Sequence, residues 1–98
     1  MTIQKTLNGG TLSVALEGRL DTTTAPLLEA DLKASMDGIT ELELDFEKLE
    51  YLSSAGLRVL LAAQKVMNKQ GKMVIRHVNE TIQEVFEITG FIDILTIE

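Results

Sequence analysis

The residues best suited to chemistry lie together at Ser53-Ser54-Ala55-Gly56-Leu57. A strand-like segment ends here and a long apolar helix pattern begins, so the two hydroxyls lie at the start of a helix. The unpaired backbone N–H groups of a helix N-terminus favour negative charge. One interpretation is a plain N-cap, because serine is a preferred capping residue. The other is a phosphorylation site, because a phosphate would be tolerated at this position.

Asp21 is the second candidate, since it follows a predicted strand and precedes a predicted helix. Its carboxylate can cap that helix or complement its dipole. It can also serve in binding, because the loops beyond the carboxyl ends of the strands form the usual recognition edge of an open α/β sheet. Ser54 also lies between a strand and a helix. If the two strands are parallel neighbours, Asp21 and Ser54 lie on the same edge of the sheet.

Few other residues support catalysis or metal binding. His77 is the only histidine, and we expect a surface or hydrogen-bonded side chain. An esterase that used Ser54 would need Ser54, His77 and Asp21 to converge, and no spacing predicts this. The chain has no cysteine and no spacing typical of metal ligands, a P-loop or a dinucleotide site. We therefore expect no enzymatic activity, no metal and no cofactor.

Acidic residues outnumber basic ones by 15 to 9, which gives a formal net charge of −6. No basic stripe is evident, so we expect neither nucleic acid nor an anionic membrane surface as a partner. The 98 residues suit a single domain spanning 1–98. The lack of cysteine, of a signal-like run in residues 1–7 and of any apolar run able to span a bilayer favours a cytoplasmic protein.

Strand-like and helix-like segments alternate along the chain. The expected strands are residues 3–7, 12–16, 42–46 with a continuation at 49–52, 73–75 and 92–97. The last of these is either a strand or a tail pinned to the sheet. The expected helices begin near Pro26, at the two serines and after Asn79, and they end near Gly38, Gln70 and Gly90.

The order β-β-α-β-α-β-α-β predicts an α/β fold with crossover connections and a mostly parallel sheet. Asn8-Gly9-Gly10 predicts a hairpin, which adds an antiparallel edge and makes the sheet mixed. Between Glu41 and Phe46, apolar residues alternate with acidic ones. Unpaired carboxylates are too costly to bury under a packed helix. The helices should therefore cover mainly one face of the sheet.

Five segments in this order resemble the STAS-domain family, and among its members the bacterial anti-sigma-factor antagonists. The segments are Gly18–Asp21, Thr22–Ala25, Leu42–Phe46, Leu52–Leu57 and Glu87–Phe91. The resemblance covers essentially the whole chain. It implies a STAS fold, with a mixed sheet, an N-terminal hairpin and helices packed mainly on one face.

The resemblance implies a function in partner switching. The unphosphorylated antagonist binds an anti-sigma factor that is also a serine kinase, and this frees the sigma factor. The kinase phosphorylates a serine at the start of the central helix, which ends the interaction, and a serine phosphatase restores the antagonist.

The same resemblance assigns roles to individual residues. The family's phosphoacceptor lies two residues before the glycine, which is Ser54 here, and Asp21 matches a family aspartate that contributes to the kinase contact. The family aspartate before the acceptor is replaced by Ser53, which leaves Ser53 as a second acceptor candidate. The expected partner-binding residues are Asp21, Thr22, Ser53, Ser54, Ala55 and Gly56, where Gly56 would let a partner's backbone approach closely.

A second function stays open at this point. Single STAS domains also occur as subunits of transporter or lipid-transport complexes, where the same edge would bind a transporter ATPase and phosphorylation would be irrelevant. For the oligomeric state we expect a monomer or a weak dimer, because an exposed strand edge permits pairing.

Overall fold

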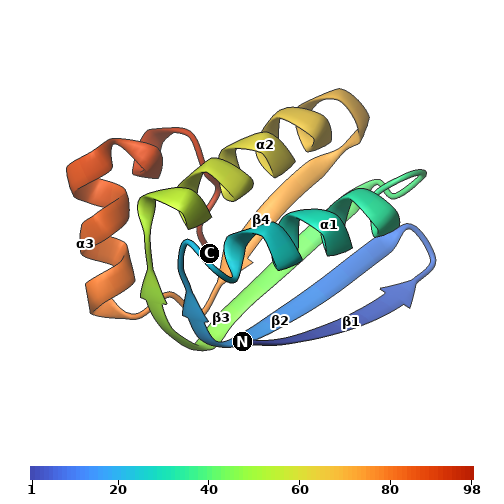
Figure 1. The fold of residues 1–98 in the computed structure, drawn as a ribbon. Coiled ribbons are helices and arrows are strands. Elements are labelled where there is room, and N and C mark those ends of the chain that lie inside the picture. The colour runs from blue at the N-terminus through green and yellow to red at the C-terminus, as the bar shows by residue number, and fades with distance from the viewer.

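A four-stranded sheet with its helices on one side forms the frame of the molecule (Figure 1). The computed structural model describes all residues, 1–98. The elements are β1 (Thr2–Asn8), β2 (Thr11–Leu20), α1 (Ala25–Ser35), β3 (Glu41–Leu52), α2 (Ser54–Gln70), β4 (Lys72–Arg76), α3 (Glu80–Thr89) and the short 3-10 helix η1 (Phe91–Asp93). The predicted α/β fold and the order of elements through α3 are confirmed.

The strands lie in the order β1-β2-β3-β4 across the sheet. β1 and β2 form the predicted antiparallel hairpin, and its turn places Gly9 at a φ of 62°, a conformation that glycine adopts easily. β2 pairs with β3, and β3 with β4, in parallel. The sheet is therefore mixed and mostly parallel, as the sequence predicts.

Helices α1 and α2 lie side by side on one face of this sheet (Figure 1). The alternation of apolar and acidic residues along β3 explains why the helices pack on this face of the sheet. Leu42, Leu44 and Phe46 are fully buried toward the helices, whereas Glu43 and Asp45 keep partial access to solvent on the opposite face. Burying those carboxylates without partners would cost several kcal/mol each, roughly. The prediction that the helices cover mainly one face is confirmed.

One apolar cluster of 24 buried residues joins the sheet to all three helices. α2 contributes the largest buried stripe among the helices, which includes Leu57, Leu60 and Met67. α1 adds Leu28 and Leu32 from one of its sides. This stripe spacing of three and four residues is what an amphipathic helix needs to cover a sheet. The position of α2 as the central helix is thus set by its sequence.

The C-terminal segment differs from the expected final strand at 92–97. Gly90 adopts a φ of 81° and ends α3, and η1 then turns the chain. Only a single parallel bridge, Ile75 with Ile97, connects this tail to β4. It is held by hydrogen bonds from Ile75 N–H to the Thr96 carbonyl and from Glu98 N–H to the Ile75 carbonyl, both at 2.9 Å. The alternative expectation, a tail pinned to the sheet, describes the structure.

Gly71 allows the turn from α2 into β4. A Cβ at this position would overlap the backbone carbonyl oxygen of Thr40, which accepts a hydrogen bond from Lys72 N–H. We predict that Gly71→Ala lowers the free energy of unfolding by about 3 kcal/mol, since backbone atoms would have to move. Gly10→Ala is the matched control, because the only close contact of its Cβ would be with the Thr40 side-chain oxygen, at 2.8 Å, and the Thr40 backbone nitrogen is 3.8 Å away.

Urea denaturation of both variants tests this prediction. The control should lose less than about 1 kcal/mol, because a side chain can rotate away from the added methyl group. Equal losses for Gly71→Ala and Gly10→Ala would contradict the role assigned to the backbone contact.

Candidate functional site

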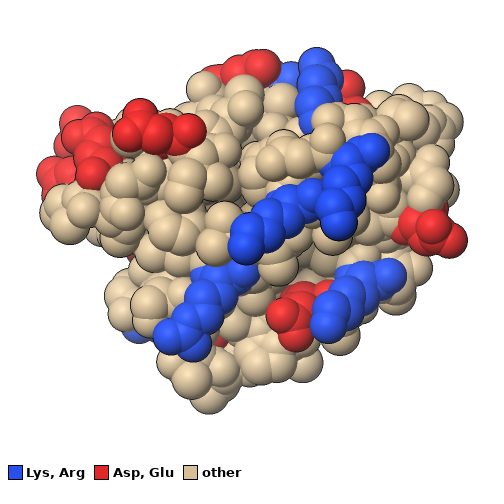
Figure 2. All heavy atoms as spheres, turned by 90° about the horizontal axis from the view of Figure 1, so that it is seen from above, with Lys and Arg blue, Asp and Glu red and all other residues tan.

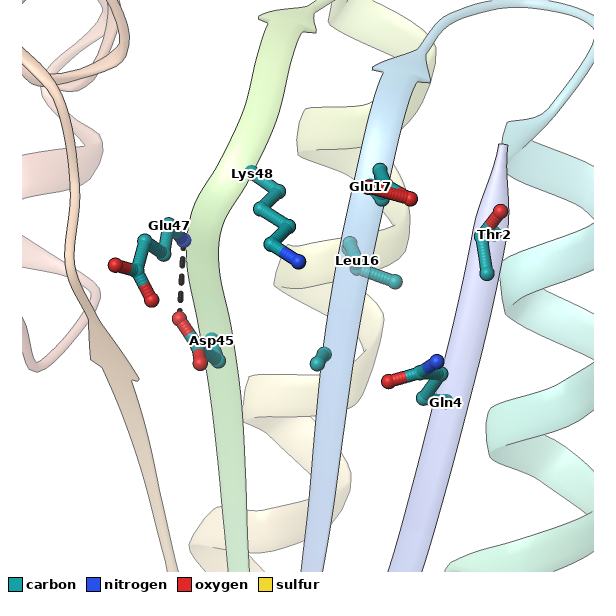
Figure 3. Close-up of a pocket in the computed structure, with 8 residues that line it drawn as sticks. Thr2, Gln4, Leu16, Glu17, Asp45, Glu47 and Lys48 are labelled. Atoms are coloured by element: carbon teal, nitrogen blue, oxygen red, sulfur yellow. Dashed lines mark hydrogen bonds between the residues drawn. The ribbon is translucent and has the colours of Figure 1, made fainter.

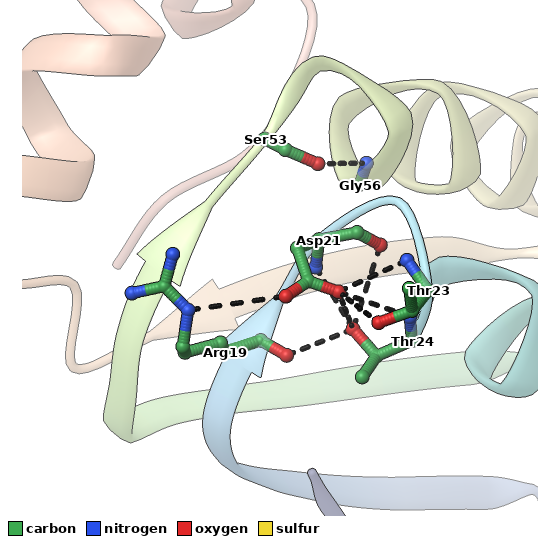
Figure 4. A network of polar contacts seen from close by, with 6 residues as sticks. All are labelled: Arg19, Asp21, Thr23, Thr24, Ser53 and Gly56. Carbon is green, nitrogen blue, oxygen red and sulfur yellow. Dashed lines mark hydrogen bonds and ion pairs between the residues drawn. The ribbon is translucent and has the colours of Figure 1, made fainter.

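The parallel pairing of β2 and β3 brings the two predicted site segments together. The last residues of both strands, Leu20 and Leu52, are register partners. Immediately beyond them, the Ser53 N–H donates a hydrogen bond of 2.9 Å to the Leu20 carbonyl. Asp21 and Ser54 therefore follow neighbouring strands at one edge of the sheet, as predicted. Figure 4 shows Asp21 and Ser53 at this edge.

The two serines at the start of α2 differ in their surroundings. Ser53 is the N-cap, and its Oγ accepts a hydrogen bond of 3.4 Å from the Gly56 N–H (Figure 4). Ser54 is the first residue of the helix and its side chain is exposed. Its hydroxyl makes no hydrogen bond within the chain. The capping interpretation thus applies to Ser53, and Ser54 carries the free hydroxyl.

Gly56 serves the packing of this chain rather than the approach of a partner. It is buried, and a Cβ built on it would lie 2.7 Å from Leu52 Cδ1 and 2.8 Å from Leu20 Cγ. The missing side chain lets the first turn of α2 rest directly on the ends of β2 and β3. The expectation that Gly56 leaves room for a partner's backbone is wrong, because the core of the protein fills that room.

The Asp21 carboxylate organises the turn that leads into α1. Its Oδ1 accepts hydrogen bonds from the Thr23 N–H at 3.0 Å, the Thr23 hydroxyl at 2.8 Å and the Thr24 N–H at 3.1 Å (Figure 4). The Thr23 hydroxyl, followed by these backbone N–H groups, holds the pKa of Asp21 below its ordinary value. Asp21 therefore stays ionised at neutral pH and closes the turn before α1. The expectation that it caps this helix is wrong, because the N-cap is Thr24 and no side chain makes a cap hydrogen bond there.

Arg19 lies next to this carboxylate. Its Nε is 3.8 Å from Asp21 Oδ2, and its guanidinium carbon is 4.1 Å from the centre of the Tyr51 ring. The contact with Tyr51 is of cation–π type and ties the end of β2 to β3. The side chain of Arg19 is thus already engaged on two sides.

A shallow hollow of about 180 Å³ lies between the starts of α1 and α2. Two of the expected partner-binding residues, Thr22 and Ala55, line it together with Pro26, Glu29 and Arg58, among others. Arg58 was missed by the sequence reasoning. The signal that could have found it is its position, which is one helical turn beyond Ser54 and therefore on the same face of α2.

The structure also corrects the expectation that no basic stripe exists. α2 contains no acidic residue, and Arg58, Lys65 and Lys69 are exposed at a spacing that places them on one helix face. Figure 2 shows basic side chains gathered across the middle of the helical face, whereas the acidic ones lie mostly at its margins, including the end where α3 lies. The net charge of −6 thus conceals a local patch of positive charge.

The open face of the sheet carries a separate group of polar residues. His77 Nδ1 lies 2.9 Å from Asp45 Oδ1, and Asp45, Glu47 and His77 bring ligand atoms within 4.8 Å of one another. These three side chains could together contact a metal ion. The sequence shows no ligand spacing for such a site, because two of the residues belong to β3 and the third follows β4. Asp45 and Glu47 are also among the residues that line a hollow of about 220 Å³ between β1, β2 and β3, and the Glu47 carboxylate points away from it (Figure 3).

The contact of His77 with Asp45 places His77 far along β3 from Ser53 and Ser54. β4 ends beside Asp45 in the middle of β3, since Arg76 pairs with Asp45, whereas Ser53 and Ser54 follow the far end of β3. The residues that an esterase triad would need, Ser54, His77 and Asp21, are therefore not brought together.

The mixed sheet, the helices on one face and the polar edge before α2 are the features of a STAS domain. The family model for the STAS domain matches residues 2–98, and the chain belongs to this family. Its polar edge is the part of the fold that the sequence singled out.

Relatives and a solved structure add to this assignment. A Bordetella bronchiseptica protein assigned as an anti-sigma factor antagonist, BtrV, is 41% identical over 90 residues, which are 90% of this chain and 78% of that protein. The anti-sigma-B factor antagonist of Staphylococcus aureus is 31% identical over 97% of this chain and 90% of its own. An anti-sigma factor antagonist of Mycobacterium paratuberculosis superposes with a TM-score of 0.88 at 25% identity, over 98% of this chain and 83% of that one.

None of the helices is both long enough and apolar enough to cross a membrane.

The network around Asp21 predicts a specific titration behaviour. The Asp21 carboxyl should titrate below its ordinary pKa of 3.8, because its charged form receives the hydrogen bonds from Thr23 and Thr24. Thr23→Val removes the largest of these contributions and should raise the pKa. Since folding lowers this pKa, the stabilising effect is complete above the unfolded pKa and is lost as the pH falls through the folded one.

Carbon-detected NMR titration of the Asp21 carboxyl measures this effect directly. Thr22→Val is the matched control, because Thr22 makes no hydrogen bond to Asp21, and it should leave the pKa unchanged. An unchanged pKa in Thr23→Val would contradict the assigned network.

Proposed function

We propose that this protein is an anti-sigma factor antagonist whose binding is switched off by phosphorylation of Ser54. The names and coverage of its relatives support the antagonist function. The observation that carries the switch is the exposed, unbonded hydroxyl of Ser54 on the first turn of α2, next to the Asp21 loop. These relatives favour the antagonist over the transporter subunit considered above.

Ser54 is the better acceptor of the two serines for a geometric reason. Phosphorylation of Ser53 would cost the hydrogen bond between its Oγ and the Gly56 N–H and would disturb the helix cap. Ser54 gives up no contact when it is modified. The hydroxyl oxygen attacks the γ-phosphorus of ATP held by the kinase, and the hydroxyl proton passes to a base of the kinase or to water. The bond from the γ-phosphorus to the β–γ bridging oxygen breaks, and ADP is released.

The charge added to Ser54 explains how the switch works without unfolding the domain. A phosphoserine carries about −1.5 to −2 charges at neutral pH, and the N-terminus of α2 partly compensates them. A partner that covers this edge would have to desolvate the phosphate beside the ionised Asp21. Burying a charge without compensation costs several kcal/mol. The scaffold therefore survives the modification while the interface does not.

The partner-binding surface in this proposal consists of Asp21, Thr22, Ser53, Ser54 and Ala55, with Gly56 supporting them from below. The unmodified edge binds an anti-sigma factor that is also a serine kinase, and the sigma factor is set free. A serine phosphatase hydrolyses the phosphate of Ser54 and returns the protein to its binding form.

Substitutions at Ser54 test the switch. Ser54→Ala should bind the anti-sigma kinase with wild-type affinity and accept no phosphate. Ser54→Glu should fold normally and bind at least about tenfold more weakly, because it places one permanent charge at the interface. Ser54→Gln is the matched control of similar size without charge, and it should bind more tightly than Ser54→Glu.

Titration calorimetry with the anti-sigma kinase gives the affinities, and intact-mass analysis after incubation with ATP identifies the modified residue. The proposal fails if Ser54→Glu binds as tightly as Ser54→Gln. It also fails if the kinase places the phosphate on Ser53 in the wild-type protein.

A further inference from the structure

We propose that Arg58 is the intramolecular partner of the phosphate on Ser54. The inference rests on the proposed function, since it assumes that Ser54 is modified. In this view Arg58 holds the phosphate against the face of α2, and the phosphate in turn removes the free positive charge of Arg58 from the binding edge.

The geometry of α2 places the two side chains together. Residues four apart on a helix are neighbours on the same face, and Ser54 and Arg58 have this spacing. Both side chains are exposed, so neither has to leave a packed position to meet the other. Arg58 also lines the hollow beside Thr22 and Ala55, which locates it at the binding edge. A guanidinium in this position matches the oxygens of a phosphate in a bidentate manner.

The other charged groups near this edge are less suited to the phosphate. Arg19 is engaged by Asp21 at 3.8 Å and by the Tyr51 ring. Asp21 is acidic and its Oδ1 is occupied by the Thr23 and Thr24 groups. On α1, Glu29 lines the same hollow and lies 3.8 Å from Lys33. Arg58 takes part in none of the ion pairs of the structure and is therefore the available cation.

The pairing is specific to Ser54. Ser53 precedes Arg58 by five residues, a separation that does not place two side chains on the same helix face, and its Oγ is turned to the Gly56 N–H. Lys65 shares the face of Arg58 but lies two further turns along α2. A phosphate on Ser54 should therefore be influenced by Arg58 alone among the cations of α2.

The consequence concerns the charge that a partner encounters. In the unmodified protein, Arg58 contributes a free cation to the hollow that Thr22 also lines, and Thr22 directly follows the ionised Asp21. After modification the phosphate carries about −1.5 to −2 charges, which outweigh the single charge of Arg58. The edge thus changes from partly positive to negative in one step. Arg58 stabilises the modified state in the isolated domain and strengthens the contrast between the two states.

Phosphorus NMR of the protein with phosphoserine incorporated at position 54 tests the pairing without any partner. The second pKa of a phosphoserine is about 6. Arg58→Ala should raise it by about 0.2–0.4 units, because an exposed pair of this spacing is modest in strength. Arg58→Lys should recover most of the wild-type value, since it keeps the charge.

Three controls make the result specific. Lys65→Ala and Arg19→Ala should each leave the phosphate pKa unchanged, and so should Arg58→Ala when phosphoserine is incorporated at position 53 instead. Equal phosphate pKa values for the wild type and Arg58→Ala at position 54, or a shift caused by Arg19→Ala instead, would overturn the inference. Failure of the proposed function would be seen separately, in the affinity of Ser54→Glu for the kinase.

Discussion

The pairing of the last residues of β2 and β3 is the contact on which the functional edge depends. The hydrogen bond from the Ser53 N–H to the Leu20 carbonyl fixes where both strands stop. After each of the two strands the chain leaves the sheet and leads into a helix at the same end of the sheet, so Asp21 and Ser54 come to lie on one edge. The absence of a side chain at Gly56 lets α2 start directly on these strand ends. A slip in this register would separate the two polar segments.

The edge combines a rigid part with a modifiable part. The Asp21 turn is held by several hydrogen bonds and by Arg19, and the Ser53 hydroxyl is used to cap α2. These contacts do not involve the Ser54 hydroxyl, which stays unbonded beside them. An exposed hydroxyl that contributes nothing to the fold can be modified without loss of stability. Because the Ser54 hydroxyl is exposed, a phosphate added to it would directly contact any protein that binds this edge.

The sequence predicts much of this arrangement, because it depends on local signals. The alternation in β3, the apolar stripe of α2 and the caps at Ser53 and Asn79 follow from patterns that span a few residues. The shared edge of Asp21 and Ser54 follows from the parallel order of the strands. The resemblance of five segments to STAS domains then supplied the family, which the match over residues 2–98 confirms.

Features that depend on tertiary packing were not predicted correctly. The segment 92–97 has strand-like composition but makes one bridge only, because η1 takes up its first two residues and turns the chain, so that only Ile97 pairs with β4. The expected approach of a partner's backbone to Gly56 is wrong, since the contacts of Gly56 with Leu20 and Leu52 form only once the helix is docked on the sheet. The basic face of α2 is hidden in the sequence by the acidic total. His77 is an exposed, hydrogen-bonded side chain as expected, but its partner Asp45 lies 32 positions away in the sequence and could not be named from it.

The central claim is that a phosphate on Ser54 abolishes partner binding while the fold stays intact. The most direct measurement is the affinity of the anti-sigma kinase for the protein with phosphoserine incorporated at position 54, compared with the unmodified protein. The account predicts binding weakened about 100- to 1000-fold, which corresponds to the cost of burying the phosphate beside Asp21. Equal affinities of the two forms would contradict it.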